Sequence, residues 1–330
     1  MQNIYQASGT TQRISNALAG ALKKMILSSG LSPAWQHVVL LEDLRVGEVN
    51  RASRAQWCAS GKVLNVAVAL HLLQARCTSL TIVGGPTGEA IKRDLAALNT
   101  RAAWINCASP TRVCTSLVET GGRIATEVVE PTGPVSADEL RAFQDRFASE
   151  SAGADYVVFT GSLPPGVPPQ ISRDLVAATD ARVILDIRGP ELIAALPQRP
   201  FLVKPNCSEL ATTLGRRIDD QQQLLCSMRE LNSRGAQWVV VTHGSAAVFA
   251  SSATETYRVD PPTCPVVSPI GCGDCLAAGL AWALDEGDTM REALPRAVAA
   301  AAANLASPLP GRLDPARARE LAESVECQRL

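Results

Sequence analysis

Four short apolar runs, separated by helix-forming stretches, constrain the fold of this chain most. The runs occupy residues 155–161, 182–187, 200–206 and 237–244 and are rich in β-branched residues. Runs of this kind are typical of strands that are buried on both faces of a parallel sheet, with helices on either side. The sequence therefore predicts an α/β fold, in which a doubly wound, mostly parallel sheet is flanked by helices.

Two other regions fit poorly in such a core. Residues from about 37–57 and 111–130 form short segments in which apolar and polar residues alternate, as in half-exposed strands. We expect them to form a small β-sheet that serves as a lid on a single domain of residues 25–330. Residues 1–24 are polar and end in two lysines, so we expect a disordered extension there.

Composition excludes several classes of protein. The formal net charge is −1, which gives no basis for a nucleic-acid partner. No apolar run approaches the roughly 20 residues of a membrane span, so no membrane partner is expected either. The ten cysteines are scattered, and Cys77, Cys114 and Cys226 lie in stretches where a reduced cysteine acts as a small core residue. We expect a cytoplasmic protein.

Polar residues gather where the predicted strands end. Thr160, Asp186, Lys204, Asn206 and Thr242 each follow or close one of the four apolar runs. In open α/β sheets ligands bind beyond the carboxyl ends of the strands. This edge of the sheet is therefore the expected functional site.

The stretch Gly271-Cys272-Gly273-Asp274 carries the strongest chemical signal. A helix is expected to follow it, with Leu276, Leu280 and Leu284 on one face and Gly287 at its end. Glycines allow successive backbone N–H groups to point outward, and a helix N-terminus attracts anions. The cysteine pair formed by Cys272 and Cys275 offers a different interpretation, as a metal or thiol-redox site.

The C-terminal stretch 266–284 resembles the signature of the ribokinase-like (PfkB) carbohydrate kinases, which usually reads Gly-Ala-Gly-Asp. Residues 47–52, 125–136, 160–168, 202–210 and 239–250 are similar to further segments of that family, in the branch of phosphofructokinases and tagatose-6-phosphate kinases. The motifs follow the family's order from about residue 30 to 315. The resemblance implies an ATP-dependent kinase for a phosphohexose.

On the nucleotide side, the resemblance gives each matching residue a role. Asp274 would be the general base, and the backbone N–H groups of Gly271, Cys272 and Gly273 would stabilise the transferred phosphoryl group. Asn206 and Glu209 would hold Mg²⁺, largely through water. The resemblance implies ATP contacts at Lys204, Asn206, Thr242, Gly244, Ser268 and Asn304, although Asn304 could instead be a polar residue on a helix surface. A monovalent cation is a further candidate cofactor.

On the sugar side, the chain departs from the family's pattern. Gln36 stands where an aspartate normally grips sugar hydroxyls, and Ser60 and Val63 replace two glycines. Arg112 matches a position that contacts the phosphate already on the acceptor, or else is an exposed arginine on a side strand. Arg188 replaces a small residue and has no assigned role. The expected substrate contacts are Gln36, Ser60, Gly61, Lys62, Asn65, Arg112 and Ser162.

Three hypotheses follow from these residues. The first is a kinase acting on fructose 6-phosphate, fructose 1-phosphate or tagatose 6-phosphate. The second is a regulatory or weakly active sugar- or nucleotide-binding protein on the same fold, which the departures at Gln36, Ser60 and Val63 motivate. The third is the thiol or metal site at Cys272 and Cys275. A homodimer formed through the lid sheet is a further expectation from the resemblance.

Overall fold

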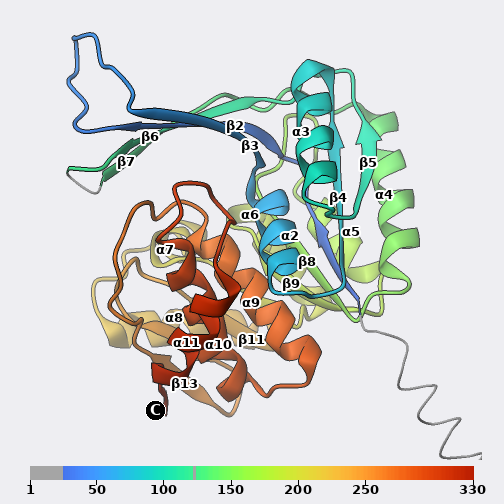
Figure 1. Ribbon diagram of the computed structural model, residues 1–330. Helices are drawn as coiled ribbons and strands as arrows, with labels where there is room; N and C mark the ends of the chain where they lie inside the picture. Colours follow the sequence, from blue (N-terminus) through green and yellow to red (C-terminus); the bar gives the residue numbers. More distant parts are fainter. Residues whose placement is uncertain (1–24, 122–123) are drawn as a thin grey trace, which may run out of the picture.

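The computed structural model describes residues 25–121 and 124–330. A large central sheet is covered by helices on both faces, and a second, small sheet projects from one edge of the molecule over the C-terminal half (Figure 1). The predicted α/β class and the small second sheet are confirmed. The extension predicted for residues 1–24 lies outside the described residues.

Within the described residues the central sheet has ten strands in the order β14-β13-β12-β11-β10-β9-β8-β1-β4-β5. The strands from β5 to β11 are parallel, whereas β12, β13 and β14 add an antiparallel edge. The parallel strands are β1 (Ile26–Ser29), β4 (Cys77–Val83), β5 (Ala102–Asn106), β8 (Tyr156–Thr160), β9 (Arg182–Asp186), β10 (Leu202–Val203) and β11 (Trp238–Val241). The antiparallel strands are β12 (Val248–Ser251), β13 (Thr256–Val259) and β14 (Cys327–Arg329).

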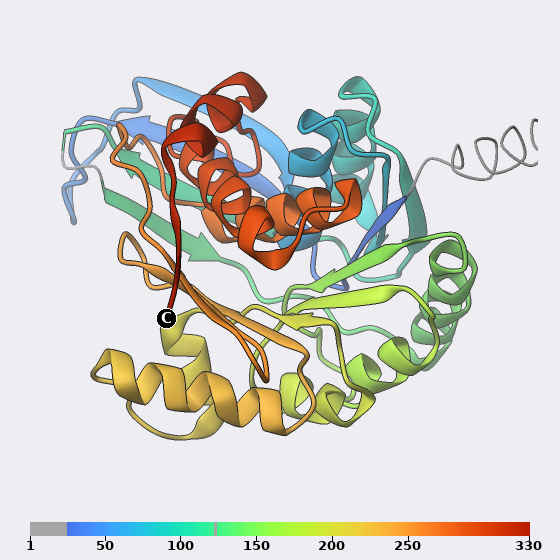
Figure 2. The ribbon, with the colours of Figure 1, turned by 90° about the horizontal axis from the view of Figure 1, so that it is seen from below.

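Helices cover the two faces of this sheet separately, as Figure 2 shows from below. One face carries α2 (Lys62–Leu72), α9 (Cys272–Glu286), α10 (Met290–Asn304) and α11 (Pro315–Ser324). The other face carries α4 (Ala137–Ser151), α5 (Ile171–Ala177), α6 (Gly189–Ala195), α7 (Cys207–Leu214) and α8 (Gln221–Ser233). The remaining helix, α3 (Gly85–Ala97), packs near the base of the small sheet.

Alternation along the buried strands explains why both faces need helices. In β8, Val158 faces the core beneath α9 and α10, while its neighbours Val157 and Phe159 face the core beneath α4 and α5. All three are at most 2% exposed. Successive strand side chains point to opposite faces, so a strand without polar residues must be covered on both.

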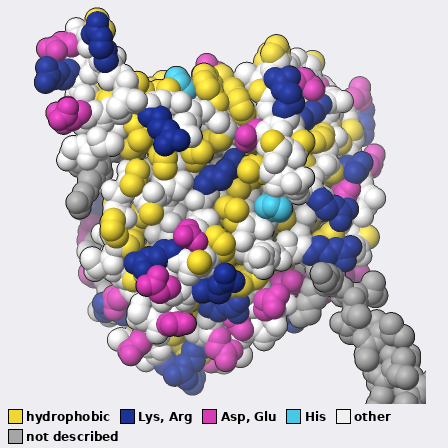
Figure 3. All heavy atoms as spheres, in the orientation of Figure 1, with side chains coloured by type: hydrophobic (Ala, Val, Ile, Leu, Met, Phe, Trp, Pro, Cys, Tyr) yellow, Lys and Arg dark blue, Asp and Glu magenta, His cyan; other side chains and the backbone are white. Residues whose placement is uncertain are grey.

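The small sheet has the order β3-β2-β6-β7, formed by β2 (Ala34–Leu41), β3 (Arg54–Ser60), β6 (Val113–Glu119) and β7 (Ile124–Val129). The first predicted region, 37–57, is three residues too short at each end, because the pairing of β2 with β3 extends to Ala34 and Ser60 at the base of the sheet. Figure 3 shows hydrophobic side chains along this sheet and charged side chains of both signs at the tip of the loop between β2 and β3. In the described part of the chain, no helix is long and apolar enough to cross a membrane.

The prediction that Cys226 is a core residue is wrong, whereas Cys77 and Cys114 are buried as expected. In α8 the buried positions are Leu224, Ser227, Met228 and Leu231, spaced three and four residues apart. Cys226 lies two residues after Leu224 and so falls on the solvent side of this amphipathic helix.

Candidate active site

Helix α9 begins at a tight glycine turn. Gly271 precedes its first residue with φ of 84°, a left-handed conformation that favours glycine. A Cβ atom at this position would lie 2.8 Å from the Gly311 nitrogen and 2.8 Å from Pro310 Cβ. The turn therefore depends on glycine for its dihedral angle and for space. The Cys272 N–H donates a long hydrogen bond of 3.3 Å to the Pro269 carbonyl. A phosphoryl oxygen bound at the turn would share this N–H group with that carbonyl.

Asp274 lies in the first turn of α9 and is only 6% exposed. Its Oδ2 accepts a hydrogen bond of 2.7 Å from Nδ2 of Asn65, which α2 carries across the interface between the two helices. Burial raises the pKa of Asp274 to about 6, and Asp186 adds to that rise, while Lys62, Asn65 and Lys204 oppose it. A carboxylate with this pKa is ionised at neutral pH and can still accept a proton.

A pair of lysines shares one buried carboxylate beside this turn. Asp186, at the end of β9, lies 3.0 Å from Lys204 Nζ and 3.4 Å from Lys62 Nζ, and it accepts a hydrogen bond from Thr160 Oγ1. Burial alone would raise the pKa of Asp186, but the two lysines hold it below its ordinary value. The Lys204 ammonium is also 3.7 Å from where a Cβ of Gly273 would stand, so positive charge borders the anion turn. Asp186 was expected at a strand end, without an assigned role.

A cavity of about 1010 Å³ opens beside the turn, between α7, α9 and α10. Among the predicted nucleotide contacts, Asn206, Thr242 and Gly244 line it, as do Cys272 and Gly273. The rest of the wall is mostly apolar, with Val248, Val266, Leu276, Val298 and Leu305 among its members. An apolar slot that ends at an anion-binding helix terminus suits a nucleotide, whose base is flat and whose phosphates are charged.

Two predicted nucleotide residues lie behind the cavity wall. Asn304 and Ser268 are completely buried. Asn304 Nδ2 donates to the Ile270 carbonyl at 2.8 Å and faces Cys272 Sγ at 3.5 Å, so it fastens the turn from behind. The alternative that placed Asn304 on a helix surface is wrong, because its face of α10 packs inward against α9. The proposed direct contact of Asn304 with ATP stays a prediction.

Asn206 and Glu209 cap the N-terminus of α7 reciprocally. Asn206 Oδ1 accepts from the Glu209 N–H at 2.8 Å, and Glu209 Oε2 accepts from the Asn206 N–H at 2.9 Å. The other carboxylate oxygen of Glu209 lies 3.6 Å from Lys62 Nζ and 3.9 Å from Arg188 Nη1. Arg188, whose role was open, is thus a largely exposed cation on the rim of this cluster.

The sugar-side residues meet at the mouth of the small sheet. Arg112 Nη2 donates to the Ser32 carbonyl at 3.4 Å, and Ser162 Oγ donates to Ser32 Oγ at 3.3 Å. Thr132 Oγ1 joins the same group, 3.0 Å from Ser32 Oγ. Ser32 and Thr132 were not predicted as site residues, although Thr132 lies in the segment 125–136 that carried the family resemblance. Arg112 is half-buried, so the alternative of an exposed arginine on a side strand does not hold.

The other sugar-side residues are largely engaged within the protein. Gln36 is 3% exposed and its Nε2 donates to Ser116 Oγ at 2.7 Å within the small sheet. Ser60 is 2% exposed and donates to Asn65 Oδ1 at 3.0 Å. Gly61 has φ of 84° at the start of α2, where a Cβ would meet Pro33 at 2.8 Å. Lys62 keeps 37% of its side chain exposed and is the cation of this group that reaches solvent.

The structure does not support a metal or redox site at Cys272 and Cys275. No group of three or more His, Cys, Asp or Glu residues that could hold a metal occurs in the described residues. Burial raises the pKa of Cys272 to about 11 and that of Cys275 well above its ordinary value, so both are thiols at neutral pH.

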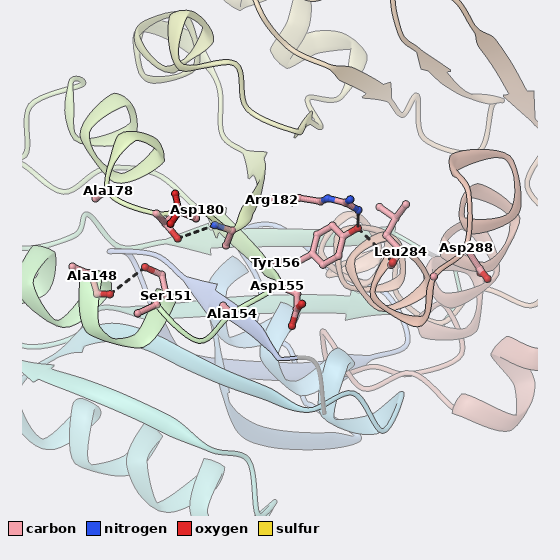
Figure 4. Close-up of a pocket in the computed structure, with 14 residues that line it drawn as sticks. Ala148, Ser151, Ala154, Asp155, Tyr156, Ala178, Asp180, Arg182, Leu284 and Asp288 are labelled. Carbon is pink, nitrogen blue, oxygen red and sulfur yellow. Dashed lines mark hydrogen bonds between the residues drawn. The ribbon is translucent and has the colours of Figure 1, made fainter. Parts of the chain in front are cut away.

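A second cavity, of about 580 Å³, lies at the opposite end of the strands. Figure 4 shows Tyr156 and Arg182 at its centre, where the guanidinium donates to the Tyr156 hydroxyl at 2.7 Å. Asp155, Asp180 and Leu284 also line it. None of the predicted catalytic, substrate-binding or nucleotide-binding residues lines this cavity, so the site at the carboxyl ends is the candidate for catalysis.

Comparison with known proteins assigns the class to which this site belongs. Residues 30–316 match the pfkB family of carbohydrate kinases, so the chain is a member of that family and a sugar kinase. The chain is 32% identical to 1-phosphofructokinase of Bacillus subtilis (strain 168) over 258 residues, covering 77% of this chain and 84% of the relative. It is 29% identical to 1-phosphofructokinase of Vibrio cholerae serotype O1 over 264 residues, covering 79% and 83%.

Solved structures agree in fold. Phosphofructokinase-2 from Escherichia coli in complex with fructose-6-phosphate aligns with a TM-score of 0.82 and 25% identity, over 92% of this chain and 98% of that one. The same enzyme in complex with potassium aligns over the same shares with a TM-score of 0.83 and 25% identity. The predicted ribokinase-like fold and the family are thereby confirmed.

Proposed function

We propose that this chain transfers the γ-phosphoryl group of ATP to a hydroxyl of a phosphorylated hexose, with fructose 1-phosphate as the first candidate acceptor. The observation that carries the proposal is the buried Asp274 at the glycine turn, ionisable near pH 6 and flanked by Lys62 and Lys204. The names of the Bacillus and Vibrio relatives support a phosphofructokinase activity and put fructose 1-phosphate ahead of fructose 6-phosphate or tagatose 6-phosphate.

In the proposed reaction the acceptor oxygen forms a bond to the γ-phosphorus as the bond to the bridging oxygen of ADP breaks. Asp274 takes the proton of the acceptor hydroxyl. Since Oδ2 is held by Asn65, we assign that proton to Oδ1. The N–H groups at residues 271–273 donate to the oxygens of the phosphoryl group as it is transferred. The positive end of the α9 dipole stabilises the negative charge of these oxygens. Lys204 offsets the charge of the nucleotide phosphates.

Magnesium is the cofactor that such a reaction implies, and the residues present fit a hydrated ion. Glu209 Oε1 is the carboxylate oxygen left outside the α7 cap, and Asn206 lines the cavity at the same helix terminus. Because no all-protein metal cage occurs in the described part of the chain, Mg²⁺ would keep several waters and bind phosphate oxygens. When bound, it would neutralise phosphate charge. A monovalent cation remains a further candidate, since the Escherichia coli enzyme was solved with potassium.

Arg112 and Ser162 are the proposed contacts of the acceptor. A guanidinium binds the existing phosphate in a bidentate manner, and the hydroxyls of Ser32, Thr132 and Ser162 form a donor-rich rim beside it. Replacement of Arg112 by Leu should raise KM for the sugar phosphate about 10²-fold and change KM for ATP little, because a charge-assisted contact contributes roughly 1.5–3 kcal/mol.

The experiment measures ADP release with MgATP and a panel of phosphohexoses. Wild type should turn over at least one of them, whereas Asp274→Asn should lose about 10²–10⁴ in kcat and still bind ATP, as calorimetry can show. Turnover of Asp274→Asn near the wild-type rate would refute the assignment of the base. Absence of turnover with every sugar phosphate would favour the regulatory binding protein.

We also propose a homodimer that forms through the small sheet. Trp57, Ile124 and Val128 share one face of it and are 47–58% exposed, and Trp57 stacks on His37 at 4.1 Å between ring centroids. Large apolar side chains that cluster in this way on a projecting sheet are typical of a subunit contact. Sedimentation velocity should give a dimer for wild type and a monomer for Val128→Glu; a wild-type monomer at micromolar concentration would contradict the proposal.

A further inference from the structure

The hydroxyl of Ser60 occupies a position behind the proposed base. Ser60 is the last residue of β3 and is 2% exposed, and Asn65, on the first turns of α2, is 4% exposed. The Ser60 hydroxyl donates to Asn65 Oδ1 at 3.0 Å, and Asn65 Nδ2 donates to Asp274 Oδ2 at 2.7 Å. The three side chains form one buried chain of hydrogen bonds in which each donor points toward the carboxylate.

The direction of the Asn65 amide decides what Asp274 meets. With the amide as it stands, an N–H group faces the carboxylate. If the amide turned over, its carbonyl oxygen would face the carboxylate, and two acceptors would oppose each other in a dry environment. A donor beside Oδ1 favours the first orientation, and Ser60 supplies that donor.

We propose that Ser60 is a positioning residue for the base, which keeps the Asn65 amide turned so that its N–H group holds Asp274 Oδ2. The catalytic consequence rests on the proposed kinase function, whereas the hydrogen-bond chain itself does not. The corresponding motif of the carbohydrate kinase family usually has a glycine at this position, and glycine has no hydroxyl group.

If the Asn65 amide is held less firmly in its orientation, the Asp274 carboxyl group should be harder to ionise. Asn65 stabilises the charged form of Asp274, so weakening its bond raises the pKa of Asp274. The other groups that face this carboxylate are Lys62 on α2, Lys204 after β10 and Asp186 at the end of β9. None of these three bonds to the Ser60 hydroxyl, so their effects should be the same in wild type and in a Ser60 variant.

The test compares Ser60→Ala with a matched control, Ser28→Ala. Ser28 is also fully buried and its hydroxyl donates to α2, at the Val63 carbonyl 2.7 Å away, but it does not touch Asn65. The pKa of Asp274 is read from the ¹³C shift of its carboxyl carbon in the whole protein, assigned with Asp274→Asn. This titration needs no turnover, so it tests the positioning role even if no sugar phosphate is phosphorylated.

Ser60→Ala should raise the pKa of Asp274 by about 0.5, the shift expected when one neutral hydrogen bond in a chain is weakened. In an assay with the sugar phosphate that the wild-type enzyme prefers, kcat at pH 6 should fall about twofold more than kcat at pH 8. Ser28→Ala should leave the pKa in place while lowering thermal stability, and Ser60→Thr, which keeps the hydroxyl, should restore the wild-type value.

Two results would overturn the proposal. One is an Asp274 pKa that stays within 0.1 of wild type in a folded Ser60→Ala protein, since 0.1 is far below the shift of about 0.5 expected from one hydrogen bond. The other is an equal rise in Ser60→Ala and Ser28→Ala, which would mean that any lost bond to α2 has the same effect. In Asn65→Ala, adding Ser60→Ala should cause no further rise; an additive rise would show that Ser60 acts by another route.

Discussion

Asp186→Asn is the substitution that tests the charge arrangement beneath the site most directly. The side chain of Asp186 is 1% exposed and that of Lys204 is 4% exposed, with 3.0 Å between Oδ1 and Nζ. At an effective dielectric constant of about 20, two unit charges at that distance attract with about 5 kcal/mol. Asparagine keeps the shape and leaves the lysine charge without its partner. After the lost burial cost of the carboxylate is subtracted, we expect the free energy of unfolding to fall by about 3 kcal/mol.

The pH dependence of this loss follows from the lowered pKa of Asp186. The wild-type carboxylate stabilises the fold fully above the ordinary carboxyl pKa of about 4, and this contribution is lost as pH falls through the lower folded-state pKa. The stabilising contribution of the Asp186 carboxylate should therefore be present from about pH 5 to 8 and shrink in stronger acid. Urea unfolding across this range measures it.

A surface pair supplies the control. Arg258 and Asp260 are 2.8 Å apart, a similar distance, but their side chains are 36% and 56% exposed. Asp260→Asn should cost much less stability than Asp186→Asn, because water screens exposed pairs. Equal losses of stability in the two variants would contradict this expectation, as would a loss of less than about 1 kcal/mol in Asp186→Asn.

Three further predictions concern the turn at the start of α9. Asp274→Asn should raise the free energy of unfolding by about 1–3 kcal/mol at pH 7.5, because the fold raises the pKa of Asp274 to about 6 and so favours the neutral acid, which asparagine resembles. Urea titrations should show that this gain in stability vanishes below about pH 4. Gly271→Ala should destabilise at least twice as much as Gly287→Ala in thermal unfolding: both glycines have positive φ, which costs alanine about 1–2 kcal/mol, but only the Cβ at 271 would clash. Equal losses would contradict the crowding. Cys272→Ala should keep kcat within about twofold of wild type, since only the backbone of this residue enters the anion site. The purified wild-type protein should hold no zinc. A large loss of kcat in Cys272→Ala would support the thiol hypothesis instead.

Much of the fold followed from the sequence because strong local patterns coincide with tertiary needs. The runs that predict buried strands became β8, β9, β10 and β11, and Gly287 ends α9 as predicted. The antiparallel edge was harder to foresee. Strands β12 and β13 are four residues each, and β14 lies far along the chain from its partner β13, so no local pattern announces their pairing.

The site was predictable in its residues and less so in its contacts. Asp274, Lys62 and Asn65 were named, and the structure brings them together. The link of Lys62 and Lys204 through Asp186 is made by three segments that meet only in the fold, so spacing along the chain does not reveal it. Cys226 shows the opposite case, because the helical period of its neighbours placed it on the solvent side and only its apolar surroundings suggested burial.

The hydrogen bond between Asn65 and Asp274 also has a consequence for synthesis. It joins residues that are 209 positions apart. A ribosome that adds about 5–20 residues per second needs roughly 10–40 s to cover that distance. During that interval the N-terminal half can already have folded around α2 while the amide of Asn65 still lacks its carboxylate. Each nascent molecule thus contains β1, β4, β5 and β8 well before the proposed catalytic carboxylate is made.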